Sequence, residues 1–465
     1  MNTSLTQEWR EHARRLPDRI ALHELGSNLS WSWGQLLQEV ELRRAQLRAL
    51  GLAPGTRLVL LDEASNQWVA WMWACFEEEV VWCPLPPSQA LDRRTQQIKH
   101  CDPHAIVEND QIARQENAQD LCPPDSAYLI YTSGSTGIPK GVLVGRSGLR
   151  SLWQAQQALF GTTEDTRASW MLSPAFDASV SDVGVALTAG ATLFIVPPGR
   201  WLRYQSWQHD MDMHQIDQVD APPSWLGLWR NKAPPSSLRT IIAGGEPTPL
   251  AILQAWSSQV RWVNVYGPTE TTVCTSAEIR KGSDPELVQS SIGQPFAHVS
   301  YALHPLSDQT DQNVGELWIG GNAVALGYWK DDALTQSRFI EQDGVRWFKT
   351  GDWVEHKHGQ WIWKGRLDRQ VKRNGKLLNL DEVENVVQRC PGVSLACVIV
   401  DLSDKLCLIM PQDAPGNEAI KSWCSTRLPA WGNPARIVRL SDFPKTQTGK
   451  VDRERVRSQL QELKA

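Results

Sequence analysis

The sequence lacks a hydrophobic run long enough to cross a membrane. Its richest apolar stretch, Trp68 to Phe76, is far shorter than the ~20 residues that a spanning helix needs. Residues Met1 to Arg15 carry several charges and no continuous apolar core, unlike a secretion signal. We therefore expect a cytoplasmic protein with no membrane partner.

An excess of charge of one sign is also absent. The 47 basic and 52 acidic residues give a net charge of −5, and the charged residues are interspersed along the chain. This pattern provides no basic surface of the kind that binds nucleic acid. Internal repeats and low-complexity tracts are missing too, so the sequence favours a globular enzyme with no nucleic-acid partner.

Cysteines at metal-binding spacing are likewise missing. The nine cysteines are scattered singly, which favours reduced thiols in the core over a metal site or a disulfide framework. The 23 tryptophans are an excess, and we expect most of them to be packing residues.

What the chain does contain is an alternation of helical and strand patterns over its first two thirds. Helical periodicity from Leu36 to Leu50 ends at Gly51, and Arg57 to Leu61 then reads as a strand. At 465 residues with 41% hydrophobic content, the chain can bury a large core and should divide into at least two domains. The polar segment from Asp102 to Pro124 is predicted to be a surface loop.

The pattern changes after about residue 366, where short strands and helices suggest a compact α+β unit. We predict an α/β fold with two domains, a large multi-layer domain of mixed sheets and helices over residues 1–366 and a small mobile lid over 367–465, with a hinge near Asp368. The predicted elements of the lid are strands at Gln370–Arg373, Ala396–Asp401 and Leu406–Met410 and helices at Leu380–Gln388, Glu418–Leu428 and Val451–Leu463.

A loop rich in hydroxyl groups and glycine, from Tyr131 to Lys140, has the composition of a phosphate-binding loop. Glycines let main-chain amides face an anion, hydroxyls donate hydrogen bonds, and the lysine adds positive charge. A Walker loop would place Ser or Thr and a helix after its lysine, whereas Gly141 to Val144 reads as a strand. The residues expected to contact phosphate are Thr132, Ser133, Gly134, Ser135, Thr136, Gly137 and Lys140.

Four further motifs follow this loop at wide spacing, and all five occur in the order found in one superfamily. Together they resemble the adenylate-forming superfamily of acyl- and aminoacyl-activating enzymes, most of all the adenylation domains of nonribosomal peptide synthetases. The four motifs are Phe176-Asp-Ala-Ser-Val180, Tyr266-Gly-Pro-Thr-Glu270, Lys349-Thr-Gly-Asp352 with Gly365-Arg-Leu-Asp368, and Pro444-Lys-Thr-Gln-Thr-Gly-Lys450.

The resemblance implies an ATP site with Mg²⁺. It places the Tyr266 ring against adenine, Thr269 near the α-phosphate, Glu270 on Mg²⁺, and Asp352 on both ribose hydroxyls. Gly245 and Arg366 are further candidates for nucleotide contact. Taken singly, Tyr266 could be a core aromatic, Asp352 a turn residue and Arg366 an interdomain ion pair.

Lys450 is the residue that the resemblance assigns to the adenylation step, although a lone lysine near a C-terminus is usually a surface residue. The resemblance also implies two catalytic poses, with the small domain rotating about Asp368 to present the loop at Gly375 to a phosphopantetheine thiol. Asn374 stands where relatives commonly have arginine, which bears on the carrier or the hinge.

Asp177 indicates an amino-acid substrate, because in the resembling domains this aspartate pairs with the α-ammonium group. Asp220 suggests a side chain with a polar or cationic tip, such as lysine, ornithine or glutamine, with a tyrosine-like phenol as second choice; a solvent-facing loop carboxylate is the alternative. Ser181-Asp182 stands where many relatives have Trp-Glu. The expected side-chain pocket is Ala178, Ser181, Asp220, Ile242, Gly244, Val265, Val273 and Cys274, with small Ser181 and Gly244 leaving depth.

We therefore expect a ligase that activates an amino acid as aminoacyl-AMP and loads it onto a carrier protein in nonribosomal peptide or related biosynthesis. No carrier domain follows Lys450 before Ala465, so the carrier is expected to act in trans. A coenzyme A ligase for a small acid and an inactive scaffold paralogue are the alternatives. Asp177 speaks against the former, and the presence of Lys140, Glu270 and Lys450 speaks against the latter.

Overall fold

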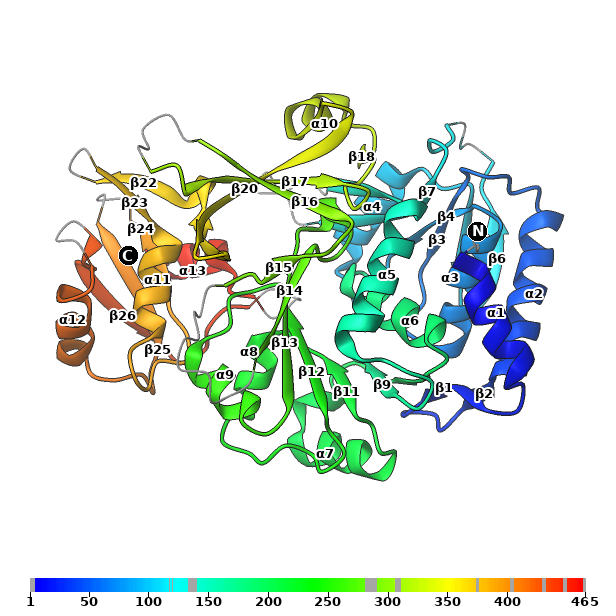
Figure 1. Ribbon diagram of the computed structural model, residues 1–465, viewed down its shortest axis with the longest axis horizontal. Coiled ribbons are helices and arrows are strands. Elements are labelled where there is room, and N and C mark those ends of the chain that lie inside the picture. Colours follow the sequence, from blue (N-terminus) through cyan, green and yellow to red (C-terminus); the bar gives the residue numbers. More distant parts are fainter. Residues whose placement is uncertain are drawn as a thin grey trace.

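The computed structural model describes residues 5–462 except 117, 119, 133–139, 281–290, 306–310, 374, 375, 402–404, 429–431 and 446–449. Figure 1 shows a large body that carries the N-terminus and a smaller body, at the left, built from the C-terminal elements. The mixed α/β fold, with a large N-terminal and a small C-terminal domain, is confirmed. The expected boundary at residue 366 stays a prediction.

Two large sheets, parallel at their centres and antiparallel at their edges, form the framework of the large domain. The first runs in the order β15 (Gln294–Pro295), β14 (Ser276–Arg280), β13 (Arg261–Tyr266), β12 (Thr240–Gly244), β11 (Gln218–Asp220), β9 (Arg167–Trp170), β10 (Thr192–Ile195), β1 (Ile20–Glu24) and β2 (Ser30–Ser32). The second runs in the order β18 (Gly327–Tyr328), β8 (Lys140–Gly145), β7 (Ser126–Thr132), β4 (Val81–Pro84), β3 (Arg57–Leu60), β5 (Ala105–Glu108) and β6 (Gln111–Arg114).

Helices pack on these sheets, and α2 shows a capping signal at each end. In α2 (Trp33–Ala49) Ser32 and Gln35 form a capping box, and the chain leaves the helix through Gly51 at φ +65°. The apolar run from Trp68 to Phe76 lies in α3 (Asn66–Glu77) and is buried on every side. The other helices are α1 (Leu5–Arg15), α4 (Leu91–Cys101), α5 (Arg146–Phe160), α6 (Ala178–Thr188), α7 (Tyr204–Met213), α8 (Pro223–Gly227), α9 (Leu250–Ser257), α10 (Asp332–Arg338) and the 3₁₀ turns η1 (Arg200–Leu202) and η2 (Thr269–Thr271).

A third sheet links the two domains. It contains β16 (Val299–His304), β17 (Val314–Gly321), β20 (Val345–Lys357), β19 (Phe339–Gln342) and β21 (Gln360–Arg366), and the 3₁₀ turn η3 (Leu367–Arg369) follows. The small domain then consists of β22 (Gln370–Arg373), β23 (Lys376–Asn379), α11 (Leu380–Gln388), β24 (Cys397–Val400), β25 (Leu406–Pro411), α12 (Asn417–Ser425), β26 (Arg436–Leu440) and α13 (Arg453–Glu462).

Most expected elements agree with these bounds, and one expectation is wrong. The segment from Asp102 to Pro124, expected to be a loop, contains the strands β5 and β6. Alternate residues of β5 are buried, and its pairing with β3 extends the second sheet. The apolar alternation was too short to stand out among the surrounding polar residues.

The side chains expected in the core are found there. All nine cysteines are buried and none forms a disulfide. Many tryptophans, including Trp33, Trp73 and Trp262, are fully buried packing residues. Among the described residues no helix has the length and apolar character that crossing a membrane requires.

Candidate functional site

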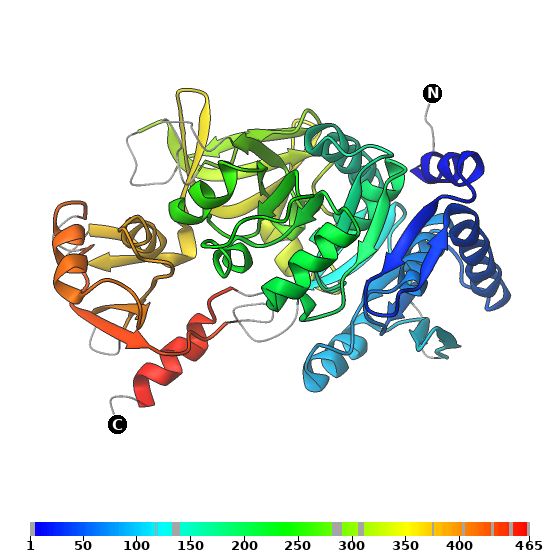
Figure 2. The same ribbon diagram turned by 90° about the horizontal axis from the view of Figure 1, so that it is seen from below.

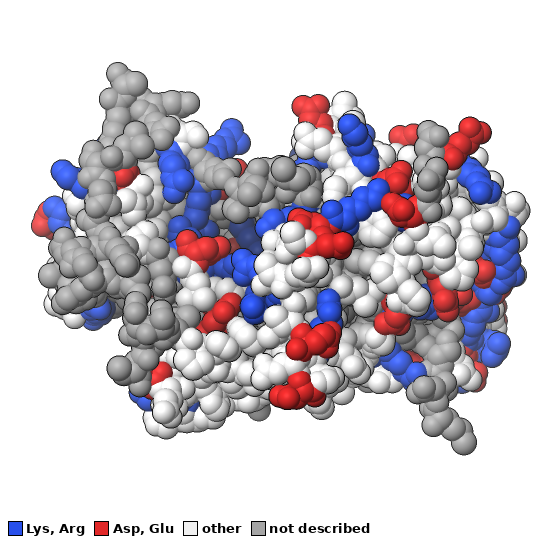
Figure 3. Space-filling view, turned by 90° about the horizontal axis from the view of Figure 1, so that it is seen from above, with Lys and Arg blue, Asp and Glu red and all other residues white. Residues whose placement is uncertain are grey.

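A cavity of about 1070 Å³ lies where the small domain faces the carboxyl ends of β12 and β13. Such strand ends are the usual place for a ligand in an α/β sheet. In the space-filling view a hollow at this junction is bordered by basic side chains, while both signs of charge are interspersed over the rest of the face (Figure 3). The cavity brings together six of the predicted site residues: Gly245, Tyr266, Asp352, Arg366 and Lys450 from the nucleotide and catalytic set, and Val265 from the side-chain pocket.

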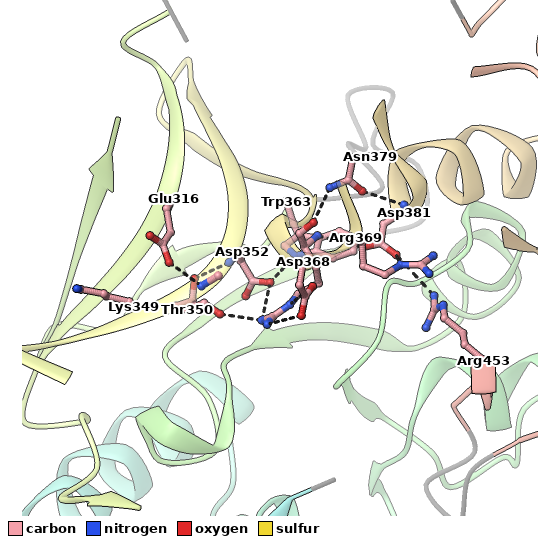
Figure 4. A network of polar contacts seen from close by, with 12 residues as sticks. Glu316, Lys349, Thr350, Asp352, Trp363, Asp368, Arg369, Asn379, Asp381 and Arg453 are labelled. Carbon is pink, nitrogen blue, oxygen red and sulfur yellow. Dashed lines mark hydrogen bonds and ion pairs between the residues drawn. The ribbon is translucent and has the colours of Figure 1, made fainter. Parts of the chain in front are cut away.

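Asp352 is held on one wall of this cavity by three donors. The Tyr266 hydroxyl donates to its Oδ2, Trp363 Nε1 donates to Oδ1 at 3.1 Å, and an Arg366 Nη lies 3.4 Å from Oδ1 (Figure 4). Burial raises the pKa of Asp352, and the charge of Arg366 opposes that shift. The carboxylate is thus fixed in position at the cavity wall.

Lys450 reaches the cavity from the small domain. Its Nζ lies 4.0 Å from the point that a β-carbon on Gly245 would occupy, and Gly245 itself has φ +79°. The charge of Lys450 lowers the pKa values of Asp177 and Glu246, although burial raises both overall. In Figure 2 the described residues that directly precede α13 (red) point from the small domain toward the large domain. The lysine therefore faces the large domain.

Asp177 stands at the N-terminus of α6, where its Oδ1 accepts from the Ala178 amide at 2.9 Å. Burial raises its pKa, while the neighbouring Thr269 hydroxyl and the Lys450 charge lower it. Asp177 therefore lies beside two of the predicted catalytic side chains and on the edge of the expected substrate pocket.

Glu270, the predicted magnesium ligand, lies in η2. Its Oε1 accepts from the Tyr328 hydroxyl at 2.7 Å, and its main-chain oxygen accepts from the Ala325 amide at 2.9 Å. Its other carboxylate oxygen has no protein partner among the described residues. A fixed carboxylate with an available oxygen suits a hard cation such as Mg²⁺.

Only the ends of the predicted phosphate loop belong to the described part of the chain. Thr132 at the end of β7 pairs with Lys140 at the start of β8 across an antiparallel ladder. The strand-loop-strand arrangement agrees with the sequence. The predicted contacts at Ser133, Gly134, Ser135, Thr136 and Gly137 lie outside the described residues.

The expected substrate pocket is assembled from α6, β11, β12, β13 and the turn after η2. Asp220 pairs with Ile242 and Gly244 with Val265 across neighbouring strands. A β-carbon on Gly244 would lie 2.5 Å from Val265 Cγ2, so glycine is required here by the approach of β13 rather than by pocket depth.

On the opposite side of this pocket, Gln156 of α5 joins α6 to the turn after η2. Its Nε2 donates to Ser181 Oγ at 3.0 Å and to Cys274 Sγ at 3.1 Å. Thr272 and Val273 have φ of +59° and +67°. A β-branched residue in this region is strained, and such strain is commonly found at functional sites.

Asp220 is not a solvent-facing loop carboxylate. Burial, with a further contribution from the charge of Asp177, raises the pKa of Asp220 to about 7. The charges of Asp220 and Asp177 also raise the pKa of Cys274, which burial already places well above its usual value. These effects indicate that Asp177 on α6, Asp220 at the end of β11 and Cys274 lie near one another.

A polar network joins the two domains next to the predicted hinge (Figure 4). Arg366 donates its amide to Asp381 Oδ2 at 3.0 Å, and Arg369 donates to Asp381 Oδ1 at 2.8 Å. Arg453, three residues beyond Lys450, donates to Glu384 Oε2 at 2.6 Å. Arg366 thus lines the cavity and contacts the small domain through its main-chain amide, and its contact with the nucleotide stays a prediction.

The predicted hinge residue Asp368 lies in η3 with its side chain exposed, 3.4 Å from Arg366 Nε. Gly375, predicted to face the carrier thiol, and Asn374 beside it lie outside the described residues. The network connects η3, α11 and α13 within the small domain and joins α11 to Arg366 at the end of β21, while Lys450, three residues before Arg453, lines the cavity.

Sequence reasoning missed four side chains that the structure brings to these sites: Glu246, Trp363, Gln156 and Asp182. Glu246 directly follows Gly245 and could have been found as a charged neighbour of a predicted nucleotide contact. Asp182 was noticed only as a departure from relatives. Gln156 and Trp363 carry no local signal.

Comparison with protein families agrees with this geometry. A model described as "AMP-binding enzyme" matches residues 9–123 and 108–329, and one described as "AMP-binding enzyme C-terminal domain" matches residues 382–450.

Among curated proteins, bacitracin synthase 3 of Bacillus licheniformis is 31% identical over 97% of this chain, which corresponds to 8% of that protein. Tyrocidine synthase 1 of Brevibacillus parabrevis is 28% identical over 97% of the chain and 44% of its own length. The chain thus spans less than half of these relatives.

Solved structures show the same architecture. A four-domain nonribosomal peptide synthetase bound to AMP and glycine has a TM-score of 0.83 and 25% identity, over 97% of this chain and 36% of that one. Klebsiella oxytoca NpsA in complex with 3-hydroxyanthranilyl-AMSN has a TM-score of 0.85 and 21% identity, over 99% and 100%. The second likeness bears on the fold alone.

Proposed function

Because the chain belongs to the family of AMP-binding enzymes, we propose that it activates an amino acid with ATP as aminoacyl-AMP and then passes the aminoacyl group to a phosphopantetheine thiol. Family membership confirms the predicted resemblance to adenylate-forming enzymes of nonribosomal peptide synthesis. The observation that carries the proposal is the convergence of Lys450, Tyr266 and Asp352 on one cavity, with Asp177 beside the same lysine.

In the first step a substrate carboxylate oxygen attacks the α-phosphorus of ATP. The bond between the α-phosphorus and the bridging oxygen breaks, and pyrophosphate leaves with that electron pair. Lys450 would offset the negative charge that grows on the carboxylate and the α-phosphate, an electrostatic contribution that is largest in a water-poor site. Asp352, already held by its donors, would accept hydrogen bonds from the ribose diol.

The predicted phosphate contacts and the metal complete this site. Lys140 and the hydroxyl loop that begins at Thr132 would hold the departing pyrophosphate, and Glu270 would hold Mg²⁺ through its available oxygen. Mg²⁺ bound there supplies positive charge to the phosphate oxygens.

Asp177 is the basis for proposing an amino acid rather than another acid. A buried carboxylate is costly unless a cation pairs with it. The α-ammonium group of an amino acid would supply that cation, with Thr269 keeping the Asp177 carboxyl oriented. A plain carboxylic acid would leave Asp177 unpaired.

For the second step we propose transfer to a carrier protein, with the thiol attacking the acyl carbon and AMP leaving. This step would require Lys450 to withdraw by rotation of the small domain near Asp368. That the carrier is a separate protein stays a prediction. The matched test offers the purified chain free coenzyme A and a phosphopantetheinylated carrier, and faster thioester formation with coenzyme A would favour the alternative ligase.

The first step is tested by ATP–pyrophosphate exchange across a panel of amino acids. We expect exchange with one amino acid or a few related ones. Lys450→Ala should lower it about 100- to 1000-fold, while Lys421→Ala, an exposed lysine on α12, serves as the matched control. An exchange rate in Lys450→Ala within tenfold of the parent rate would refute the role of Lys450. If the parent showed no exchange with any acid, the alternative of an inactive scaffold protein would be favoured.

A further inference from the structure

Asp182 is a half-buried residue whose carboxylate the activation chemistry above does not use. It lies on α6, one turn after Ala178 and directly after Ser181. Its Oδ2 is inaccessible to solvent and has no hydrogen-bond partner. Across the described part of the chain, no ion pair reaches Asp182. An unpaired buried carboxylate is costly, so it calls for an explanation.

Asp220, at the carboxyl end of β11, lies close enough for its charge to raise the pKa of Asp182 further, on top of the effect of burial. The Asp220 side chain also has no hydrogen bond or ion pair to any described residue. The charge that raises the pKa of Asp220, on top of the effect of burial, comes from a third carboxylate, Asp177. No lysine or arginine is among the described groups that shift the pKa of Asp182 or Asp220.

A third unpartnered acceptor faces the same space. Gln156 is only 1% exposed, and its Nε2 is occupied by Ser181 and Cys274, but its Oε1 accepts no hydrogen bond in the described structure. The arrangement depends on close packing of α5 and α6, since a β-carbon on Gly184 would lie 2.0 Å from Trp153. Glycine at position 184 thus lets α5 bring the Gln156 amide to the α6 wall.

The end of the pocket therefore presents two carboxylates and an amide oxygen, and no cationic side chain among the described residues balances them. A primary ammonium group has three donors and no acceptor, and it carries the charge that the pair lacks. The amide of glutamine would bring an acceptor oxygen among acceptors, and the phenol of tyrosine would bring one donor. When both carboxyl groups are ionised, the lining offers acceptors only, and this favours an ammonium group over both.

We propose that Asp182 and Asp220 together bind the terminal ammonium group of a basic amino acid of the lysine or ornithine type, with Gln156 Oε1 accepting a further hydrogen bond. Asp182 is then a specificity-determining residue next to the wall that Ser181 forms. This inference rests on the proposed amino-acid activation, whose substrate class it specifies.

The test compares ATP–pyrophosphate exchange with lysine, ornithine and norleucine, the last being an isostere that lacks the side-chain ammonium group. For the parent protein kcat/KM with lysine or ornithine should exceed that with norleucine by at least about 100-fold. Asp182→Asn should lower kcat/KM for lysine or ornithine about 10- to 100-fold, chiefly because KM rises. In the same variant kcat/KM for norleucine should stay within threefold of the parent value. Asp165→Asn, which changes a 97% exposed carboxylate, is the matched control.

The inference would be overturned if Asp182→Asn preferred the basic substrates over norleucine as strongly as the parent does, or if its kcat/KM fell equally for all three substrates. The variant should also have a Tm no lower than the parent, because it loses a buried charge, which distinguishes loss of recognition from loss of fold.

Calorimetry distinguishes failure of the proposed activation reaction from failure of the proposed ammonium site. If the parent catalyses no exchange, saturable binding of ornithine that Asp182→Asn abolishes still supports the ammonium site. Lack of such binding to the parent would overturn it.

Discussion

The two ends of the active site differ in how their carboxylates are satisfied. Asp352, where the ribose is proposed to bind, already accepts from Tyr266, Trp363 and Arg366. Asp182 and Asp220, where the substrate side chain is proposed to bind, have no donor among the described residues. A neutral diol needs a carboxylate held in place by the protein, whereas a cationic ligand can supply the missing charge itself. The nucleotide end is thus complete before binding, and the side-chain end is not.

The largest effect on stability and on ATP binding should come from replacing Asp352 at the nucleotide end. Asp352→Ala leaves the Tyr266 hydroxyl and Trp363 Nε1 without an acceptor in a buried site and removes the buried partner of the Arg366 charge, which should lower the free energy of unfolding by about 2 to 4 kcal/mol. The KM for ATP should rise about 100-fold, because the ribose loses its acceptor. Urea unfolding and exchange kinetics measure the two effects, and a stability equal to that of the parent would show that the network is not satisfied as described.

Replacing a carboxylate at the side-chain end should raise the free energy of unfolding rather than lower it, and the size of the increase should depend on pH. The folded-state pKa of Asp220 is about 7, above the ~3.9 of an unfolded aspartate. Its contribution to stability is therefore fully present below about pH 4 and is lost as the pH rises through about 7.

Asp220→Asn removes that loss. The variant should match the parent near pH 4 and exceed its free energy of unfolding by about 2 to 4 kcal/mol at pH 8. Parallel urea titrations at the two pH values test this, with Asp165→Asn following the parent at both. Equal pH dependence in Asp220→Asn and the parent would contradict the view that this carboxylate is buried without a cation.

A smaller effect is expected at Gln156. Gln156→Leu removes the unpartnered Oε1 and should raise KM for the preferred amino acid about 5- to 10-fold, the value of one hydrogen bond. The KM for ATP should stay within twofold. Equal changes in both constants would show that Gln156 supports the whole domain rather than the side-chain pocket.

The smallest effect on stability should come from the exposed side chain of Asp368, which lies outside both ends of the active site. The ion pair between Arg366 and Asp368 is long, and the Asp368 side chain is 66% exposed. Asp368→Ala should therefore change the free energy of unfolding by less than about 0.5 kcal/mol. A loss above about 2 kcal/mol would mean that this pair, and not the buried contacts of Asp381, holds the domains together.

Several parts of the molecule could be predicted from sequence because their signals are local. The helices α2 and α11 and the strand β22 follow from periodicity and capping, and the motifs around Tyr266 and Asp352 identified residues that do line one cavity. The strands β5 and β6 were missed because four-residue strands among polar residues carry little pattern.

The side-chain pocket was only partly predictable, since its contacts join residues far apart in the chain. Gln156 and Cys274 are separated by 118 positions, and nothing near either residue indicates the other. The importance of Asp182 depends on the absence of a partner, which only the fold can reveal. Gly244 was assigned to pocket depth, but the approach of Val265 is what requires it.

The most direct test of amino-acid activation is exchange with lysine compared with 6-aminohexanoic acid, which keeps the side-chain ammonium group and lacks the α-ammonium group. Pairing of Asp177 with the α-ammonium group predicts that kcat/KM for lysine exceeds that for 6-aminohexanoic acid by at least about 100-fold. Equal exchange with the two acids would contradict amino-acid activation and would favour a ligase for simple carboxylic acids.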